Sequence, residues 1–319
     1  MRTYGVSATL SATGTAPAAF AQSQHGFHRP SAYDCLIWRP LMSLPELPDP
    51  RHDLTTASIL QPVGRLPIRE RFLLDELARL KLATTNQLAR LVAVGLEFET
   101  AMRLTRRHLQ RLVRSGLVRR FVNRARDRKV GAPGYVYALT AAGVRATGAA
   151  SGMGTRQRKA YRPSDAFVDH RLAISELRVR LAEQGRMHGT RTLEFQAEPD
   201  CWRRATGPAG EQLMAKPDAL VRLRVGQVEV SWFAEIDRGT ESSAVIRAKC
   251  ETYRRYELAN VEQQAHKVFP GVVFIVPTAE RARLVAKVIA QQPAADRELF
   301  AVATADEAIA VMTRMEDAG

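Results

Sequence analysis

The chain has 319 residues, a hydrophobic content of 45% and a mean hydropathy of -0.22, values that argue against a membrane or wholly disordered protein. No run approaches 18 consecutive apolar residues, so we expect no membrane-spanning segment and no membrane partner. Cys35, Cys201 and Cys250 are too few and too widely spaced for a disulfide framework or a CxxC zinc motif, which favours a reducing, cytoplasmic location.

The formal net charge of +14 is concentrated in one part of the chain. Residues 1–62 carry four basic and four acidic side chains, and residues 164–319 carry 21 basic and 23 acidic ones. Residues 63–163 carry 22 basic and only six acidic side chains. A charge excess confined to one module indicates a polyanionic partner.

Composition divides the chain into four segments. Residues 1–62 are rich in Ser, Ala, Pro and Thr and predict a disordered leader; they lack the continuous apolar run of a signal peptide. An ordered pattern begins only after Met42, which makes this methionine a candidate start. Residues 148–165, rich in Gly and basic side chains, predict a linker between ordered regions over 66–147 and 166–316.

The first ordered region predicts three helices, a strand pair and a final helix. The apolar spacing indicates helices over 69–82, from 84 or 85 to 92, and over 100–115, the last ended by Gly116. Strands are expected over 117–122 and 135–140, joined by a turn-rich segment. This order is that of a winged helix-turn-helix domain.

The third of these helices is cationic on one face and apolar on the other. The outward stripe and its flanks comprise Arg103, Arg106, Arg107, Gln110, Arg111 and Arg114. The inward side comprises Thr105, Leu109, Leu112 and Val113. Such a helix fits the DNA major groove, where Arg reads guanine and Gln reads adenine.

The following hairpin adds more positive charge, from Arg119, Arg120, Arg124, Arg126, Arg128 and Lys129. Beside a helix in the major groove, these side chains would contact phosphates or enter the minor groove. The alternative is a merely solvated charged face, but such a face normally mixes both signs. We therefore expect double-stranded DNA as the partner.

The second ordered region predicts a mixed sheet with helices on its faces. The expected helices cover 163–184, 242–260, 279–291 and 305–315, and the expected strands cover 191–198, 217–224, 228–237, 271–278 and 299–304. The predicted fold class is therefore an α+β multi-domain chain, a winged helix-turn-helix followed by an α/β mixed-sheet domain.

Three carboxylates mark neighbouring strands of this region. Asp218 lies in one strand, and Glu235 ends the next, where alternation puts it on the same face as Asp237. Carboxylates that converge at strand ends can bind Mg²⁺, which can activate water for attack on a phosphate. The sequence thus predicts a magnesium site at Asp218, Glu235 and Asp237.

The order of helix, three strands, helix and strand, with Pro217-Asp218 and then Glu235-x-Asp237, resembles the PD-(D/E)xK nuclease fold. That resemblance implies a catalytic lysine where this chain has Asp237, and Lys249 on the following helix is a substitute source of the ammonium. Glu176 matches the acidic residue that often precedes the motif. The alternative is a pseudo-nuclease domain with a structural role only.

Other conspicuous side chains have less specific interpretations. His170 shares a helical face with apolar residues, which favours a half-buried, hydrogen-bonded histidine over a ligand or a catalytic group. Tyr253 and Tyr256 are expected to pack, and Trp202 and Trp232 are expected in the core rather than as base-stacking platforms.

Five segments together resemble the replication-relaxation family of actinobacterial plasmids and mobile elements. They are YVYALTAAG, FVDHRLAISE, KPDALVRL, FAEIDRGTES and the Lys249-x-x-x-Tyr253 spacing, within about 66–260. The resemblance implies a DNA-binding protein in plasmid replication or DNA relaxation, with a nuclease-like second half.

Two hypotheses follow for that second half. A magnesium-dependent nuclease or nickase requires Asp218, Glu235, Asp237 and Lys249 to cluster. A non-enzymatic regulator, whose second half forms a homodimer or recruits a replication or conjugation protein, predicts splayed carboxylates or ion pairs from Arg222 or Arg238. A tyrosine relaxase is disfavoured because no His-x-His pair is present.

Overall fold

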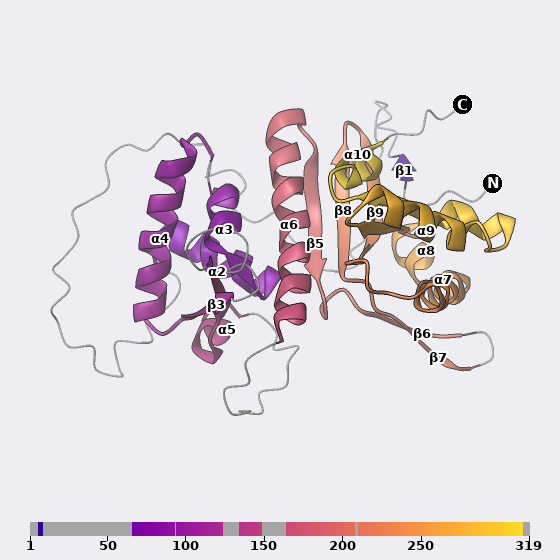
Figure 1. Ribbon diagram of the computed structural model, residues 1–319, viewed down its shortest axis with the longest axis horizontal. Helices are drawn as coiled ribbons and strands as arrows, with labels where there is room; N and C mark the ends of the chain where they lie inside the picture. Colours follow the sequence, from indigo (N-terminus) through magenta and orange to yellow (C-terminus); the bar gives the residue numbers. More distant parts are fainter. Residues whose placement is uncertain are drawn as a thin grey trace, which may run out of the picture.

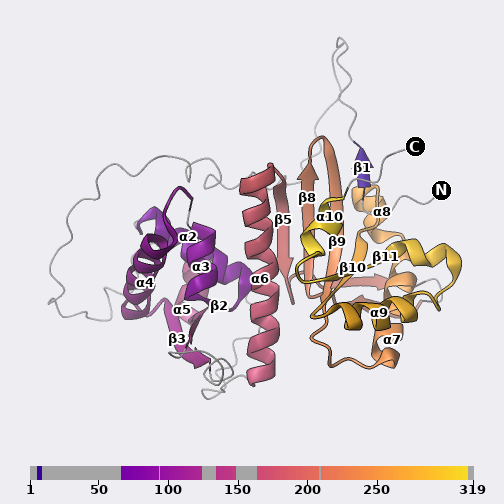
Figure 2. The same ribbon diagram turned by 45° about the horizontal axis from the view of Figure 1, so that its top comes forward.

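The computed structural model describes residues 6–8, 66–92, 94–123, 134–148, 164–207 and 210–314. The long helix α6 (Asp165–His188) lies between a small helical region and a larger sheet region, as two views of the chain show (Figures 1 and 2). Among the described residues, no helix is both long and apolar enough to cross a membrane.

The first region packs helices around a small antiparallel sheet. Its helices are α2 (Ile68–Leu80), α3 (Thr85–Val92), α4 (Phe98–Arg114) and α5 (Ala141–Thr147). Its strands, in the order β2-β4-β3, are β2 (Ala83–Thr84), β4 (Gly134–Leu139) and β3 (Val118–Asn123). This is the predicted order of elements, with β2 as an additional short strand.

Local sequence sets the ends of these helices. The Glu97 side chain accepts a hydrogen bond from Thr100 N at the start of α4, and Thr140 accepts one from Gly143 N at the start of α5. Gly116 follows α4 with a φ of +71°, a conformation that favours glycine, and the chain turns there into β3.

The second region contains a mixed sheet in the order β11-β10-β9-β8-β5. Its strands are β5 (Arg191–Ala197), β8 (Ala219–Val225), β9 (Val228–Ile236), β10 (Gly271–Val276) and β11 (Phe300–Thr304). The first three pair antiparallel, and the last two continue the sheet in parallel. The short β1 (Val6–Ala8) also pairs with β9.

Helices cover both faces of this sheet. On one face α7 (Ser243–Leu258) and α9 (Ala279–Ile289) share a buried apolar cluster with Phe233 of β9. On the other face α6 and α10 (Ala308–Thr313) pack against Ala234. Every residue of β10 is buried, as expected for a central parallel strand.

Besides the short strands β1 and β2, four elements were not predicted from the sequence. They are the hairpin of β6 (Arg203–Thr206) and β7 (Gln212–Ala215), the helix α8 (Val261–His266) and the short 3-10 helix η3 (Ala294–Leu299). The predicted α+β class with a mixed sheet is confirmed, and the other helices and strands lie close to their expected ranges.

The apolar core runs through both regions because α6 contributes to each. Leu73 and Leu77 of α2 belong to the same buried cluster as Ile174 of α6 and Val221 of β8. A buried Ser175 hydroxyl of α6 also donates a hydrogen bond to the Leu82 carbonyl at 2.5 Å. Helix α6 therefore fixes how the helical region sits against the sheet.

Candidate functional site

The outer face of α4 is a row of exposed basic side chains. Arg103, Arg106, Arg107, Gln110 and Arg114 are exposed, and no ion pair joins the four arginines to any described carboxylate. The opposite face, with Thr105, Leu109 and Leu112, is buried. The predicted division of this helix into a cationic face and an apolar face is therefore present.

A buried polar contact sets the orientation of that row. Glu70 of α2 is buried and accepts contacts from His108 Nδ1 at 3.1 Å and from Arg111 at 3.3 Å. Arg111 is thus half-buried and paired, unlike its neighbours in the stripe. The same contact holds α4 against α2, which keeps the remaining arginines turned outward.

The strand β3 carries two further exposed basic side chains, Arg119 and Arg120. The guanidinium of Arg120 lies 4.3 Å from the centre of the Tyr135 ring on β4. The predicted DNA contacts Arg124, Arg126, Arg128 and Lys129 lie outside the described residues.

In the second region, three ligand-type side chains meet at one end of the sheet. They are His170 of α6, Glu198 just after β5 and Asp218 just before β8, whose ligand atoms all lie within 4.8 Å of one another. His170 Nε2 is 3.0 Å from Asp218 Oδ1 and 3.5 Å from Glu198 Oε1. Imidazole nitrogen and carboxylate oxygen are donors that divalent cations accept.

A second group lies beside this one, around Glu235 of β9. Lys249 Nζ of α7 donates to Glu235 Oε2 at 2.8 Å and to Glu241 Oε1 at 2.6 Å. The Tyr253 hydroxyl donates to the other oxygen of Glu235. A lysine and a tyrosine one helical turn apart therefore hold a single buried carboxylate.

Strand register brings the two groups together. Ala219 pairs with Ala234, so Asp218 lies beside Glu235 at the end of the β8–β9 pair. Asp218 also accepts a hydrogen bond from Ile236 N at 2.6 Å. Burial, together with the negative charge of Asp218, raises the pKa of Glu235 to about 7.

The surroundings of Lys249 favour its charged form. Burial works against its charged form, but Glu235 and Glu241 outweigh that effect and hold the pKa of Lys249 above its ordinary value. The ammonium therefore stays protonated at neutral pH. Its side chain remains 27% exposed, which leaves it accessible from solvent.

A sequence comparison assigns this architecture to a family. The family described as replication-relaxation matches residues 74–272, more than half of the chain and across both regions. The chain belongs to the replication-relaxation family. No curated protein and no solved structure matches it.

In this replication-relaxation protein Asp237 does not belong to the His170–Glu198–Asp218 group. Its Oδ1 accepts a hydrogen bond from Gly239 N at 2.7 Å, and its Oδ2 accepts one from Arg281 Nε of α9 at 2.6 Å. Both oxygens are thus occupied by groups of the protein, and the side chain is almost fully buried. The contacts of Asp237 are those of a structural ion pair.

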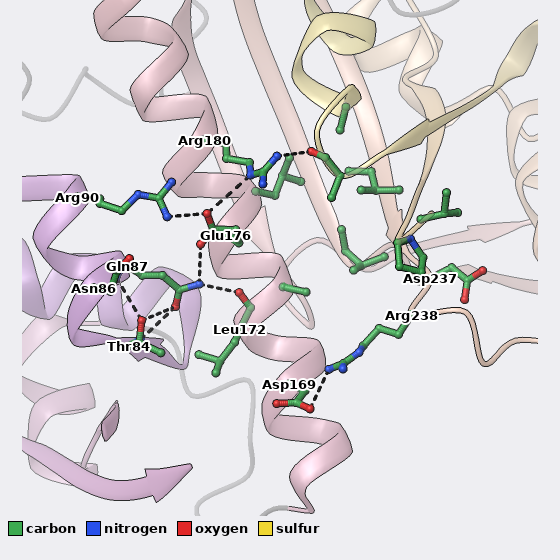
Figure 3. A pocket seen from close by; sticks show the side chains of 18 residues that line it. Thr84, Asn86, Gln87, Arg90, Asp169, Leu172, Glu176, Arg180, Asp237 and Arg238 are labelled. Carbon is green, nitrogen blue, oxygen red and sulfur yellow. Dashed lines mark hydrogen bonds and ion pairs between the residues drawn. The ribbon is translucent and has the colours of Figure 1, made fainter. Parts of the chain in front are cut away.

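Glu176 also lies outside the His170–Glu198–Asp218 group. It accepts hydrogen bonds from Arg90 at 2.6 Å and from Gln87 at 3.1 Å, both on α3 (Figure 3). The same side chains line a cavity of about 650 Å³ between α3, α6 and the ends of β9 and β10. Glu176 therefore joins the two regions.

Several members of the site were not selected from the sequence. Glu198, Glu241 and Arg281 were missed, although Glu198 ends a predicted strand and could have been compared with Asp218 on that basis. His170 lies against Asp218 as a hydrogen-bonded, half-buried side chain. The expectation that Trp202 is in the core is wrong, because this residue is 39% exposed.

Replacing Asp237 by asparagine should destabilise the replication-relaxation protein by about 3 kcal/mol, because the mostly buried Arg281 would lose its anionic partner. Urea denaturation measures this change in the free energy of unfolding. The double variant Asp237→Asn/Arg281→Met should lose less than the sum of the single changes. Unchanged stability in Asp237→Asn would contradict a structural role and favour a ligand role.

The stability of the protein should also depend on the protonation of His170. Hydrogen bonds to Asp218 and Glu198 raise the pKa of His170 from 6.5 to about 9. The protonated ring therefore stabilises the fold fully below pH 6.5, and this contribution disappears as the pH rises through 9. The stability difference between the wild type and His170→Gln should shrink by about 2 kcal/mol across that window.

Urea denaturation in EDTA, at several pH values from 6 to 10, measures the effect without bound metal. Comparison with the variant cancels the titration of all groups that do not contact His170. A difference that stays flat across this range would show that the imidazole does not bind its proton more tightly in the folded state.

Proposed function

We propose that this protein binds double-stranded DNA in the replication or relaxation of a plasmid or mobile element, and that its second half is a metal-dependent nuclease of the PD-(D/E)xK type. Membership in the replication-relaxation family supports the biological role. The single observation that carries the nuclease proposal is the contact of 2.8 Å between Lys249 and Glu235, beside Asp218.

The proposal for DNA binding rests on the first region as a winged helix-turn-helix. Three helices precede the β3–β4 hairpin, and the helix α4 presents four exposed arginines and Gln110. An α-helix fits the major groove, where arginine can bind guanine through two hydrogen bonds. Arg119 and Arg120 on the hairpin would then contact the phosphate backbone.

The nuclease proposal is supported by topology. Helix α6, the antiparallel strands β5, β8 and β9, helix α7 and the parallel strand β10 follow one another in the order that a PD-(D/E)xK domain requires. Asp218 precedes the second of these strands, and Glu235 lies in the third. The β6–β7 hairpin and the short helix α8 are insertions in that plan.

The main departure from the PD-(D/E)xK motif is at position 237, where the motif has a lysine and this chain has an aspartate. Lys249 reaches Glu235 from α7 instead, so the site has an ammonium beside its two adjacent carboxylates. A positive charge held there would stabilise the negative charge that develops on a phosphate during cleavage. Glu241 and Glu235 together position this ammonium.

The donor set also fits a divalent cation. His170 Nε2 and the carboxylates of Glu198 and Asp218 would hold it, with Glu235 alongside. The sequence predicts Mg²⁺ at Asp218, Glu235 and Asp237, but the occupied oxygens of Asp237 argue for this different set. A bound Mg²⁺ or Mn²⁺ would supply Lewis-acid polarisation of a phosphate and a more acidic water.

The second candidate function is a non-enzymatic DNA-binding regulator with a pseudo-nuclease half. One observation favours it: the carboxylates of Glu235 and Asp237 already have cationic partners, in Lys249 and Arg281. In that case the second half would serve dimerisation or a replication partner.

Supercoiled plasmid DNA incubated with the protein separates the two functions. With Mg²⁺ or Mn²⁺, and not with EDTA, the nuclease proposal expects nicked or linear DNA. A salt-dependent gel shift without any strand cleavage would reject the nuclease and leave the regulator. No shift and no cleavage on any DNA would reject both.

A further inference from the structure

An exposed tryptophan follows Glu198 of the His170–Glu198–Asp218 group by four residues. Trp202 immediately precedes β6 and is 39% exposed. The Lys216 ammonium lies 5.0 Å from the centre of its ring. Its neighbour Cys201, in the same turn, is fully buried.

Backbone contacts join the two segments that carry this pair. A tight turn follows Glu198, in which Trp202 N donates to the Pro199 carbonyl at 3.0 Å. Lys216 comes two residues before Asp218, and Glu198 N donates to the Asp218 carbonyl at 2.9 Å. The segments that carry the indole and the ammonium are therefore the segments that carry the two carboxylates.

The residues on both sides of Trp202 are held by contacts with other parts of the chain. Arg203, the next residue, pairs with Ala215 in the β6–β7 hairpin and donates to Glu262 at 3.2 Å and to Gln196 at 3.0 Å. Cys201, the preceding residue, contacts the Pro217 carbonyl at 2.9 Å. A ligand that stacks on Trp202 would need little reorganisation of the protein.

The charge around the indole is positive. Lys216 and Arg204 are both exposed, and neither forms an ion pair with a carboxylate in the part of the chain that the structure describes. The nearby exposed acid, Asp200, is paired with Lys81 at 2.7 Å. An aromatic face with unpaired cations beside it is the combination that binds unpaired nucleotides.

We propose that Trp202 and Lys216 form a docking point for an unpaired nucleotide of DNA at the edge of the carboxylate site. The base stacks on the indole, and the ammonium contacts its phosphate. Duplex DNA does not offer a base face, so the ligand is a single-stranded or locally opened strand. This inference rests on the proposed function in so far as that function makes DNA the substrate.

Fluorescence anisotropy tests the proposal with full-length protein in EDTA and a labelled oligonucleotide of twelve thymidines. The variant Trp202→Ala should bind about tenfold more weakly, and Trp202→Phe should restore most of that loss because a phenyl ring also stacks. Lys216→Met should weaken binding severalfold, with a smaller dependence on salt.

Met187→Ala is the matched control, since Met187 is 69% exposed but lies about 25 Å along α6 from His170. Binding by Trp202→Ala that equals binding by Met187→Ala would overturn the proposal. Quenching of tryptophan fluorescence by the oligonucleotide should occur in the wild type and be reduced in Trp202→Phe; equal quenching in both would also overturn it.

A parallel titration with a twelve-base-pair duplex separates this inference from the proposed function. If Trp202→Ala binds the duplex as well as the wild type does but binds the single-stranded oligonucleotide more weakly, the docking point is supported. If the wild type does not bind the duplex, the proposed DNA-binding function of α4 is rejected. An affinity for single strands that depends on Trp202 would still support the docking point in that case. Equal weakening for both probes would overturn it.

Discussion

Replacing Lys249 by methionine should lower metal-dependent nicking of plasmid DNA by about a hundredfold or more. The ammonium lies 2.8 Å from Glu235, whose neighbour across the strand pair is Asp218, and there it would stabilise charge on the attacked phosphate. Removal of a single electrostatic contact to a transition state typically costs a factor of this size. The measured quantity is the initial rate at saturating Mg²⁺.

The fold should tolerate this change. Burial and Asp218 already raise the pKa of Glu235 to about 7, so Glu235 can take up a proton when the ammonium is removed. An unchanged gel shift with duplex DNA would show that α4 remains intact.

Two further variants sharpen the result. Lys249→Arg keeps the positive charge and should retain part of the rate, and Asp218→Asn should lose at least as much as Lys249→Met. If Lys249→Met nicks DNA at the wild-type rate, Lys249 takes no part in cleavage and does not substitute for the lysine of the motif.

The triple variant Arg103→Ala/Arg107→Ala/Arg114→Ala should lose at least about a hundredfold in affinity for duplex DNA near 0.1 M salt. The three side chains are exposed along one face of α4, without ion pairs to described carboxylates, so their charge is available to a polyanion. Stability should change little, because they make no buried contact.

The salt dependence of binding gives an independent measurement. Each arginine that contacts a phosphate should lower the slope of log affinity against log salt by about one. The control Arg247→Ala/Arg283→Ala/Lys287→Ala removes the same number of charges from exposed positions on α7 and α9. Equal losses in the two triple variants would mean that only net charge matters, and α4 would have no special role.

Much of the architecture follows from local periodicity. The spacing of Leu109 and Leu112 predicts which side of α4 is buried, and Gly116 predicts its end. The strand alternation of β8 and β9 likewise places Asp218 and Glu235 next to each other. The β6–β7 hairpin was missed because its strands are only four residues long and carry little alternating pattern.

The partners of the charged side chains did not follow from the sequence. The sequence predicts that Asp237 and Glu235 face one metal. Instead, Asp237 is paired with Arg281, which lies 44 positions later in the chain. Glu176 was expected beside the carboxylates, and Arg90 of the first region holds it instead. Periodicity gives the face of an element on which a side chain lies, but not which other element packs there.

The sequence by itself determined the basic helix of the first region, most strands and helices of the second and the adjacency of the strands that carry Asp218 and Glu235, because these depend on periodicity and turns along the chain. Only the tertiary structure decided that His170 and Glu198 meet Asp218 and that Lys249 reaches Glu235 from α7. Those contacts depend on the packing of helices on the sheet, which spacing alone does not specify.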